Sequence, residues 1–167
     1  MTPHIVTPNV WQIQDSQGMF GATDLDNKVI WAPRGTSPEA KAIRLHEVLH
    51  ALTSTTDPLT NNAQAYTWLD DARIDYLVDD FAGDYRTGIR EFRYKDIDKW
   101  LDYGNKKSRR QQIKAALLGR GYRMPHITSN KEDMIWAVTT LGHLSSKTVT
   151  HASMLEIAYQ LDNKYPE

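Results

Sequence analysis

The chain has 167 residues and a formal net charge of −1, with 40% hydrophobic and 25% charged residues. This balance gives no overall attraction to nucleic acid, membrane surfaces or acidic partners, and the length fits one domain. Cysteine is absent, which excludes disulfides and thiolate metal sites, so any bound metal needs His, Asp or Glu ligands.

The sequence also lacks the marks of a secreted or membrane protein. The first residues, "MTPHIVTPNVWQIQDS", have neither the basic start nor the continuous apolar run of a secretory signal. No stretch approaches the ~18 apolar residues that a membrane span requires. We therefore expect a cytoplasmic protein with no membrane partner.

Residues 5–32 are expected to form strands. "NVWQIQ" (9–14) alternates apolar and polar side chains, and "KVIWA" (28–32) is a short β-branched run. Between them, "DSQGMFGATDLDN" carries glycines and Asx residues typical of turns. These features predict two or three antiparallel strands in a small sheet at the N-terminus.

The rest of the chain is expected to be helical. Ser37 as N-cap, Pro38 in the first turn and Glu39 beside it predict a helix over 38–53. Further helices are predicted over 59–82, 95–103, 106–118, 130–145 and 151–163, with Gly83 ending the second helix. The prediction is one α+β domain over 1–167: the sheet and two helices in 1–85, and a helical extension in 86–167.

The stretch "LHEVLHAL" (45–52) carries the pattern H-E-x-x-H on the first predicted helix. His46 and His50 are four residues apart, so they project from one face and can reach a single ion at the ~2.0–2.1 Å typical of zinc. Glu47 flanks that face and can accept a proton from water that the ion has acidified. The pattern predicts two Zn²⁺ ligands and a general base, whereas the alternative is a pair of buried, hydrogen-bonded histidines in the core.

A catalytic zinc site needs a third protein ligand. The nearest supply is "WLDDARIDYLVDD", which begins 18 residues after His50. Asp71 is favoured as the ligand, Asp70 is the competitor, and Asp75, one turn after Asp71, is expected to orient a ligating imidazole through its free N–H. The alternative is a solvated acidic helix face.

These two motifs together support a family comparison. "RLHEVLHALTS" followed by "LDDARIDYLVDDFAG" resembles a compact gluzincin, closest to the metallopeptidase domains associated with von Willebrand A proteins and cobaltochelatase subunits. It is more distantly similar to the ImmA/IrrE-like proteases that cleave repressors. The resemblance covers roughly residues 20–85, and the chain departs from it in having Asp70 and Asp75 where glutamate is usual.

The resemblance implies a zincin-like fold and a metallopeptidase activity. It implies His46 and His50 as ligands, Glu47 as base and the Asp70–Asp71 region as third ligand. It also implies a small sheet whose edge strand, taken as 28–32, holds an extended peptide by strand addition. Small stand-alone relatives of this kind occur in bacterial and phage genomes.

Peptide hydrolysis also needs a donor near the developing oxyanion. Several side chains could supply it, and no sequence context separates them beyond a weak preference for His143, which follows a glycine. The candidates are Arg73, Tyr76, Tyr85, His126, His143 and His151.

The segment 104–125 carries seven Lys or Arg and no acidic residue. It could bind nucleic acid, attract an acidic protein or pack on the protein's own acidic helix. We favour a fourth reading, a solvated helix face whose apolar side, Ile113, Leu117 and Leu118, packs on the core.

The leading functional hypothesis from these motifs is a zinc peptidase acting on a protein or peptide. The alternatives are a catalytically silent binding protein with structural zinc and a nucleic-acid-binding module.

Overall fold

The computed structural model describes residues 11–55, 62–102, 108–119, 130–146 and 148–167, apart from the side chains of 98–102. Within these ranges it contains three strands and six helices, which confirms the predicted α+β class. The strands are β1 (Gln12–Asp15), β2 (Ala22–Asp24) and β3 (Val29–Ala32). The helices are α1 (Pro38–Thr53), α2 (Ala63–Asp79), α3 (Gly83–Asp102), α4 (Arg109–Leu118), α6 (Lys131–Leu144) and α7 (His151–Lys164).

The sheet has the order β1-β3-β2, with β2 antiparallel and β1 parallel to β3. The predicted antiparallel pairing is thus confirmed for β2 with β3. It is wrong for β1, which is parallel to β3. Asp24 explains the hairpin, because its carboxylate accepts from the backbone N–H groups of Asp26 and Asn27 and tightens the turn. The longer connection after β1 lets that strand reach the far side of β3.

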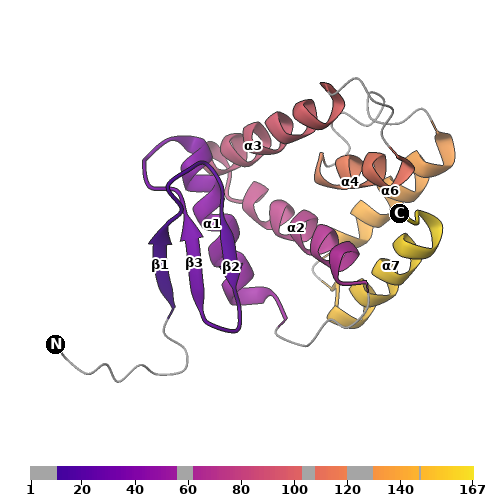
Figure 1. The fold of residues 1–167 in the computed structure, drawn as a ribbon, viewed down its shortest axis with the longest axis horizontal. Coiled ribbons are helices and arrows are strands. Elements are labelled where there is room, and N and C mark those ends of the chain that lie inside the picture. The colour runs from indigo at the N-terminus through magenta and orange to yellow at the C-terminus, as the bar shows by residue number, and fades with distance from the viewer. Residues whose placement is uncertain (1–10, 56–61, 103–107, 120–129, 147) are drawn as a thin grey trace.

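The strand order corrects one expectation. The run 28–32 forms the central strand β3, with partners on both sides, so it has no free edge for a peptide. β2 is the edge strand on the side of α1 and α2, as Figure 1 shows, and it contacts α1. The sequence predicts a hairpin turn more easily than it predicts the order of the strands in the sheet.

The helix starts follow local capping chemistry. Ser37 accepts a hydrogen bond from Ala40 N–H and α1 spans Pro38–Thr53, as predicted. α2 is shorter than predicted: Asn62 lies outside the helix with a positive φ, and 59–61 lie outside the described residues. α4 begins after Ser108, which forms a capping box with Gln111.

The expectation for α3 is wrong over 83–94, which was not predicted to be helical. The prediction that Gly83 ends α2 is wrong, because α2 ends at Asp79 with Asp80 as its C-cap, and Gly83, with a positive φ of 57°, is the first residue of α3. Gly88 weakens the helical pattern of this segment in the sequence, because glycine is a poor helix former. Its small size is required by packing: a Cβ atom there would lie 1.9 Å from the carbonyl oxygen of Pro38.

Helix α2 lies between two hydrophobic clusters. Ile74 and Val78 pack with residues of α1 and α3, whereas Leu69 and Ala72 pack with α4, α6 and α7. Figure 1 shows the same arrangement, with the sheet and α1 at one end, α4, α6 and α7 at the other, and α2 between them. The helical extension 86–167 therefore supports α2, which carries the predicted aspartates.

The apolar side of α4 is buried, as predicted for the basic segment: Ile113, Leu117 and Leu118 are at most 2% exposed. Its basic side chains have partners within the protein. Arg109 forms an ion pair with Asp133, and Arg110 pairs with Asp162 and lies over the Trp68 ring. Residues 104–107 and 120–125 lie outside the described residues, so nucleic-acid binding by the whole segment stays a prediction that is not favoured.

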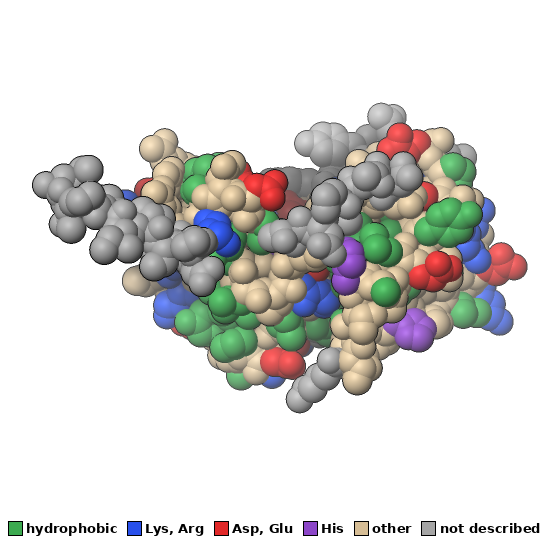
Figure 2. All heavy atoms as spheres, turned by 90° about the horizontal axis from the view of Figure 1, so that it is seen from below, with side chains coloured by type: hydrophobic (Ala, Val, Ile, Leu, Met, Phe, Trp, Pro, Cys, Tyr) green, Lys and Arg blue, Asp and Glu red, His purple; other side chains and the backbone are tan. Residues whose placement is uncertain are grey.

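One face of the molecule and the helices of the described ranges bear on the distribution of charge and of apolar residues. On the face drawn in Figure 2, the described acidic and basic side chains are interspersed among hydrophobic ones. None of the helices in the described ranges combines the length and the apolar composition that crossing a bilayer demands.

Candidate metal centre

Three potential ligand atoms converge where α1 meets α2. Nε2 of His50 lies 3.0 Å from Nε2 of His46 and 3.0 Å from Oδ1 of Asp71, and the remaining distance, from His46 Nε2 to Asp71 Oδ1, is 3.4 Å. Within the described residues, this group could hold a metal ion. The arrangement follows from the i, i+4 spacing on α1, which places both rings on the side that faces α2.

The size of this triangle fits a small tetrahedral ion. Two ligand atoms that each lie ~2.0–2.1 Å from a tetrahedral ion are about 3.3 Å apart. The three distances of 3.0, 3.0 and 3.4 Å bracket that value. Two imidazole nitrogens would repel one another through their lone pairs at such a distance unless a proton or a cation lies between them. The donor set therefore matches a cation site closed on three sides.

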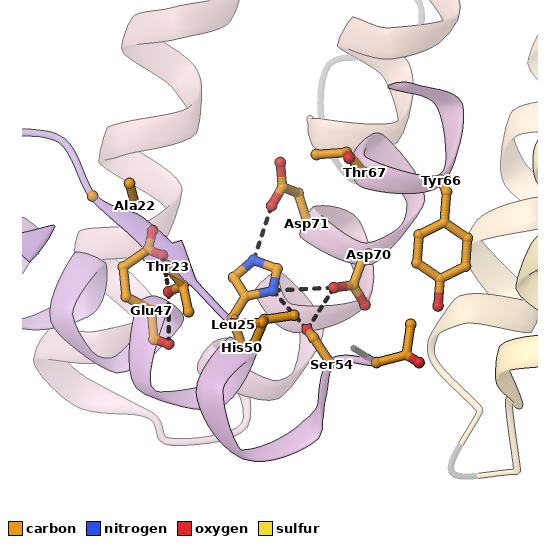
Figure 3. Close-up of a pocket in the computed structure, with 12 residues that line it drawn as sticks. Ala22, Thr23, Leu25, Glu47, His50, Ser54, Tyr66, Thr67, Asp70 and Asp71 are labelled. Atoms are coloured by element: carbon orange, nitrogen blue, oxygen red, sulfur yellow. Dashed lines mark hydrogen bonds and ion pairs between the residues drawn. The ribbon is translucent and has the colours of Figure 1, made fainter. Parts of the chain in front are cut away.

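The other nitrogen of each histidine faces an aspartate. Oδ1 of Asp75 lies 2.9 Å from Nδ1 of His46, a close contact that is off the ideal hydrogen-bond direction. Nδ1 of His50 lies 3.1 Å from Asp70 Oδ2 and 2.8 Å from the Ser54 hydroxyl. Both contacts are drawn as dashed lines in Figure 3. Such outer carboxylates fix the tautomer and the ring orientation, so that Nε2 stays available to a metal.

Two arginines distinguish Asp71 from its neighbours. Asp70 forms an ion pair with Arg73 at 2.6 Å, and Asp75, fully buried, forms a bidentate pair with Arg93. The close contacts of Asp71 are instead the two Nε2 atoms. Among the described residues, Asp70 and Asp75 thus have guanidinium partners and Asp71 has none, and it is the oxygen of Asp71 that points at both rings.

The carboxylates and imidazoles hold one another in charged form. Burial alone would raise the pKa of Asp71, but hydrogen bonds from His46 and His50 outweigh it and lower that pKa strongly. Burial alone would lower the pKa of His50, but hydrogen bonds to Asp70 and Asp71 raise it to about 10. The pKa of His46 is raised in the same way by Asp71 and Asp75, against the effect of its burial. The pocket thus favours positive charge between the two rings and Asp71.

Glu47 is held beside this group by strand β2 and the residue before it. The Thr23 hydroxyl donates to Oε2 of Glu47 at 2.6 Å and lies 3.1 Å from its backbone carbonyl oxygen. A Cβ atom at Gly21 would lie 2.6 Å from both Cγ and Oε1 of Glu47. A residue larger than glycine at this position would therefore displace the Glu47 side chain. The edge strand therefore fixes the side chain that the sequence predicts as general base.

Two cavities flank the site. The larger, of about 270 Å³, is lined by Thr23, Glu47, His50, Asp70 and Asp71 together with other residues of β2, α1 and α2; Figure 3 shows these side chains around it. The smaller, of about 140 Å³, is lined by Phe20, His46, Glu47, Asp71 and Arg93, among others. Glu47 and Asp71 line both cavities, so the candidate centre lies between them and is open to a ligand from two sides.

The structure brings together all the side chains predicted to form the site. His46, His50 and Asp71 point at one another, Glu47 lies at the cavity wall, and Asp75 faces the imidazole of His46. Asp70, the alternative third ligand, lies instead behind His50 and faces its other nitrogen.

Sequence reasoning missed Thr23, Gly21 and Arg93. A glycine followed two residues later by a threonine before a hairpin gives no signal of its own, because its role depends on strand order. Arg93 lies on the part of α3 that was not predicted, yet it holds Asp75 and lines the smaller cavity.

Those predicted oxyanion donors that lie within the described residues do not line either cavity. Arg73 pairs with Asp70, Tyr76 packs on the main hydrophobic cluster, and Tyr85 and His143 line other pockets. His126 lies outside the described residues. His151 is connected to the larger cavity through one neighbour: its Nδ1 lies 2.8 Å from the hydroxyl of Tyr66, and Tyr66 lines that cavity.

Comparison with known proteins adds no relative to this picture: no protein-family model, curated protein or solved structure was found to match the chain.

Proposed function

We propose that the protein is a zinc-dependent peptidase that hydrolyses a peptide bond in a protein or peptide. The observation that carries the proposal is the convergence of His46 Nε2, His50 Nε2 and Asp71 Oδ1 beside a glutamate held at the wall of an open cleft. Two imidazoles and one carboxylate form a ligand set that catalytic zinc uses, with a fourth position left for water or substrate.

Bound there, zinc would polarise the scissile carbonyl and lower the pKa of a water molecule. Glu47 then acts on protons: its carboxylate takes one from the attacking water and later passes it to the leaving nitrogen. Thr23 holds this carboxylate in one orientation while the proton moves. Asp70 and Asp75 keep the two imidazoles aimed at the centre.

The edge strand supports a peptide as substrate. β2 pairs only with β3 within the described sheet, and Ala22, Thr23 and Leu25 line the larger cavity. An extended peptide can therefore add to this edge with its backbone close to Glu47. A cytoplasmic setting for this activity stays a prediction.

The alternative of a binding protein with a structural ion leaves Glu47 without a task. A structural zinc site is closed by four protein ligands, whereas here the three converging atoms lie between two cavities. The two readings separate by experiment: stoichiometric zinc without any cleavage favours the structural role.

The direct test of the proposal is removal and return of the metal. The protein loaded with one equivalent of zinc is expected to cleave some members of a mixture of unstructured peptides, analysed by mass spectrometry. Treatment with a chelator followed by dialysis should abolish the cleavage, and zinc should restore it. Cleavage that survives complete removal of metal, verified by elemental analysis, contradicts the proposal.

A second prediction concerns the hydrogen bond that holds the base. Thr23→Val removes the hydroxyl that donates to Glu47 and keeps nearly the same volume, so kcat should fall by roughly three- to tenfold. Thr23→Ser keeps the donor and should retain most of the activity. Zinc content should be unchanged in both variants, and equal kcat values for the two would show that this bond has no role.

A further inference from the structure

The end of helix α1 carries a serine whose hydroxyl bonds differently from that of its neighbour. Thr53 donates to the carbonyl oxygen of Leu49 at 2.7 Å, a common bond for such a residue in a helix. Ser54, the C-cap residue, instead donates to Oδ2 of Asp70 on α2 at 2.6 Å. The same hydroxyl lies 2.8 Å from Nδ1 of His50, so it connects an imidazole of the candidate metal centre to a carboxylate, as Figure 3 shows.

The number of available protons gives these contacts a direction. A hydroxyl has one proton to donate, and Ser54 directs it at the carboxylate of Asp70. Toward His50 the oxygen of Ser54 can therefore only accept, and Oδ2 of Asp70, 3.1 Å from the same Nδ1, is also an acceptor. The proton of a neutral His50 imidazole then lies on Nδ1, which leaves the lone pair on Nε2. Nε2 is the atom that lies 3.0 Å from Oδ1 of Asp71.

Arg73 holds the carboxylate of Asp70 in the position that these bonds need. Its Nε donates to Oδ1 of Asp70 at 2.8 Å, which leaves Oδ2 for Ser54 and His50. Both of its terminal nitrogens lie 3.2 Å from the hydroxyl oxygen of Thr53, the last residue of α1. The side chains of Arg73 and Asp70 are 13% and 9% exposed, so solvent screens this ion pair little. A chain of side-chain hydrogen bonds thus joins α2 to the end of α1 and reaches His50.

We propose that Ser54 is a positioning residue of the metal centre, which links Asp70 to His50 and holds the ring with Nε2 toward the ion. This inference rests on the zinc site of the proposed function and adds a residue that lies outside the H-E-x-x-H pattern. Ser54 follows His50 by four residues, so one helical turn carries the imidazole and its hydroxyl partner. The backbone N–H of Ser54 also donates to the carbonyl oxygen of His50, at 2.9 Å. Without the hydroxyl, Nδ1 loses the nearer of these two acceptors, and the ring is less firmly oriented.

The test measures zinc affinity of the full chain by competition with a chromophoric chelator. Ser54→Ala should weaken zinc binding by about tenfold, at the lower end of the about 10–100-fold loss typical for an outer partner of a ligating histidine. Ser54→Thr keeps the hydroxyl and should bind zinc about as tightly as the wild type. Ser145→Ala is the matched control, because Ser145 is the C-cap of α6 and donates to the carbonyl oxygen of Gly142. It should leave the affinity unchanged.

A double-mutant cycle separates positioning from a purely structural role. If Ser54 acts through Asp70, the double variant Ser54→Ala/Asp70→Ala should bind zinc little more weakly than Asp70→Ala alone. Two independent contributions would instead multiply their losses. The visible absorption spectrum of the cobalt-loaded protein gives a second readout, since it reports the geometry around the ion. Its bands should change in Ser54→Ala and keep their wild-type form in Ser54→Thr and Ser145→Ala.

The possible failures are distinct. If Ser54→Ala binds zinc as tightly as the wild type and keeps its cobalt spectrum, the role of Ser54 is overturned and the proposed function stands. Losses that multiply in the double variant also overturn it, because Ser54 would then act independently of Asp70. If the wild type itself binds no zinc, the proposed function fails and takes the inference with it. Should Ser54→Ala not fold, Ser54→Val and Ser54→Thr, which are nearly equal in shape, carry the same comparison: equal zinc affinities for these two overturn the proposal.

Discussion

Replacing Glu47 by glutamine is expected to abolish peptide hydrolysis while the metal stays bound. Glutamine keeps the size of the side chain and can still accept from Thr23, but it cannot take a proton from water. Loss of a general base typically lowers the rate by about 10²–10⁴-fold. The measurement is kcat on a cleaved peptide, together with zinc content by elemental analysis.

The control for this variant is Glu91→Gln, which makes the same change at an exposed glutamate of α3. It should keep the full rate and the full metal content. A Glu47→Gln protein that cleaves as fast as the wild type would show that another group moves the proton, and the proposed role of Glu47 would have to be withdrawn. A variant that loses its zinc would instead reveal a structural role for this carboxylate.

Replacing Gly88 by alanine is expected to cause a large loss of stability, because the added methyl group meets backbone atoms of another helix. The new Cβ would lie 1.9 Å from the carbonyl oxygen of Pro38, and that backbone atom cannot rotate away as a side chain can. Helices α1 and α3 must then separate where they cross, at a cost of about 3 kcal/mol or more. For a chain of this size we expect the Tm to fall by roughly 10 °C.

Gly142→Ala provides the matched control, since it is the same substitution inside another helix, α6. A Cβ atom there meets no other atom within 4 Å, so the helix should gain roughly 0.5–1 kcal/mol from the alanine. Thermal unfolding of both variants beside the wild type measures the difference. Equal Tm values for the two variants would mean that α1 and α3 do not meet as closely as the structure has them.

The candidate site could be predicted well because its parts lie within single helices. The spacing of His46 and His50 fixes their common face, and the start of α1 is set by Ser37 and Pro38, which are local signals. Choosing Asp71 over Asp70 is harder, because both lie on α2 and differ only in rotation. The structure separates them through Arg73, which holds Asp70 behind His50.

What the sequence could not predict depends on contacts between distant segments. The parallel pairing of β1 with β3 and the edge position of β2 follow from the path of the chain, not from alternation within a strand. The first half of α3 was missed because Gly88 reads as a helix breaker, although it is needed where that helix meets Pro38. Arg93 and Thr23 acquire their roles only through these arrangements.

The measurement that bears most directly on the central proposal is the zinc content of the purified protein and of two aspartate variants. After saturation with zinc and exhaustive dialysis, the wild type should retain one ion per chain. Asp71→Ala should lose it, because it removes one of three converging ligand atoms. Asp70→Ala should keep the ion with an affinity about 10–100-fold weaker, as expected for an outer partner of His50. A wild-type protein that retains no zinc, or an Asp71→Ala variant that binds it as tightly as the wild type, would contradict the account.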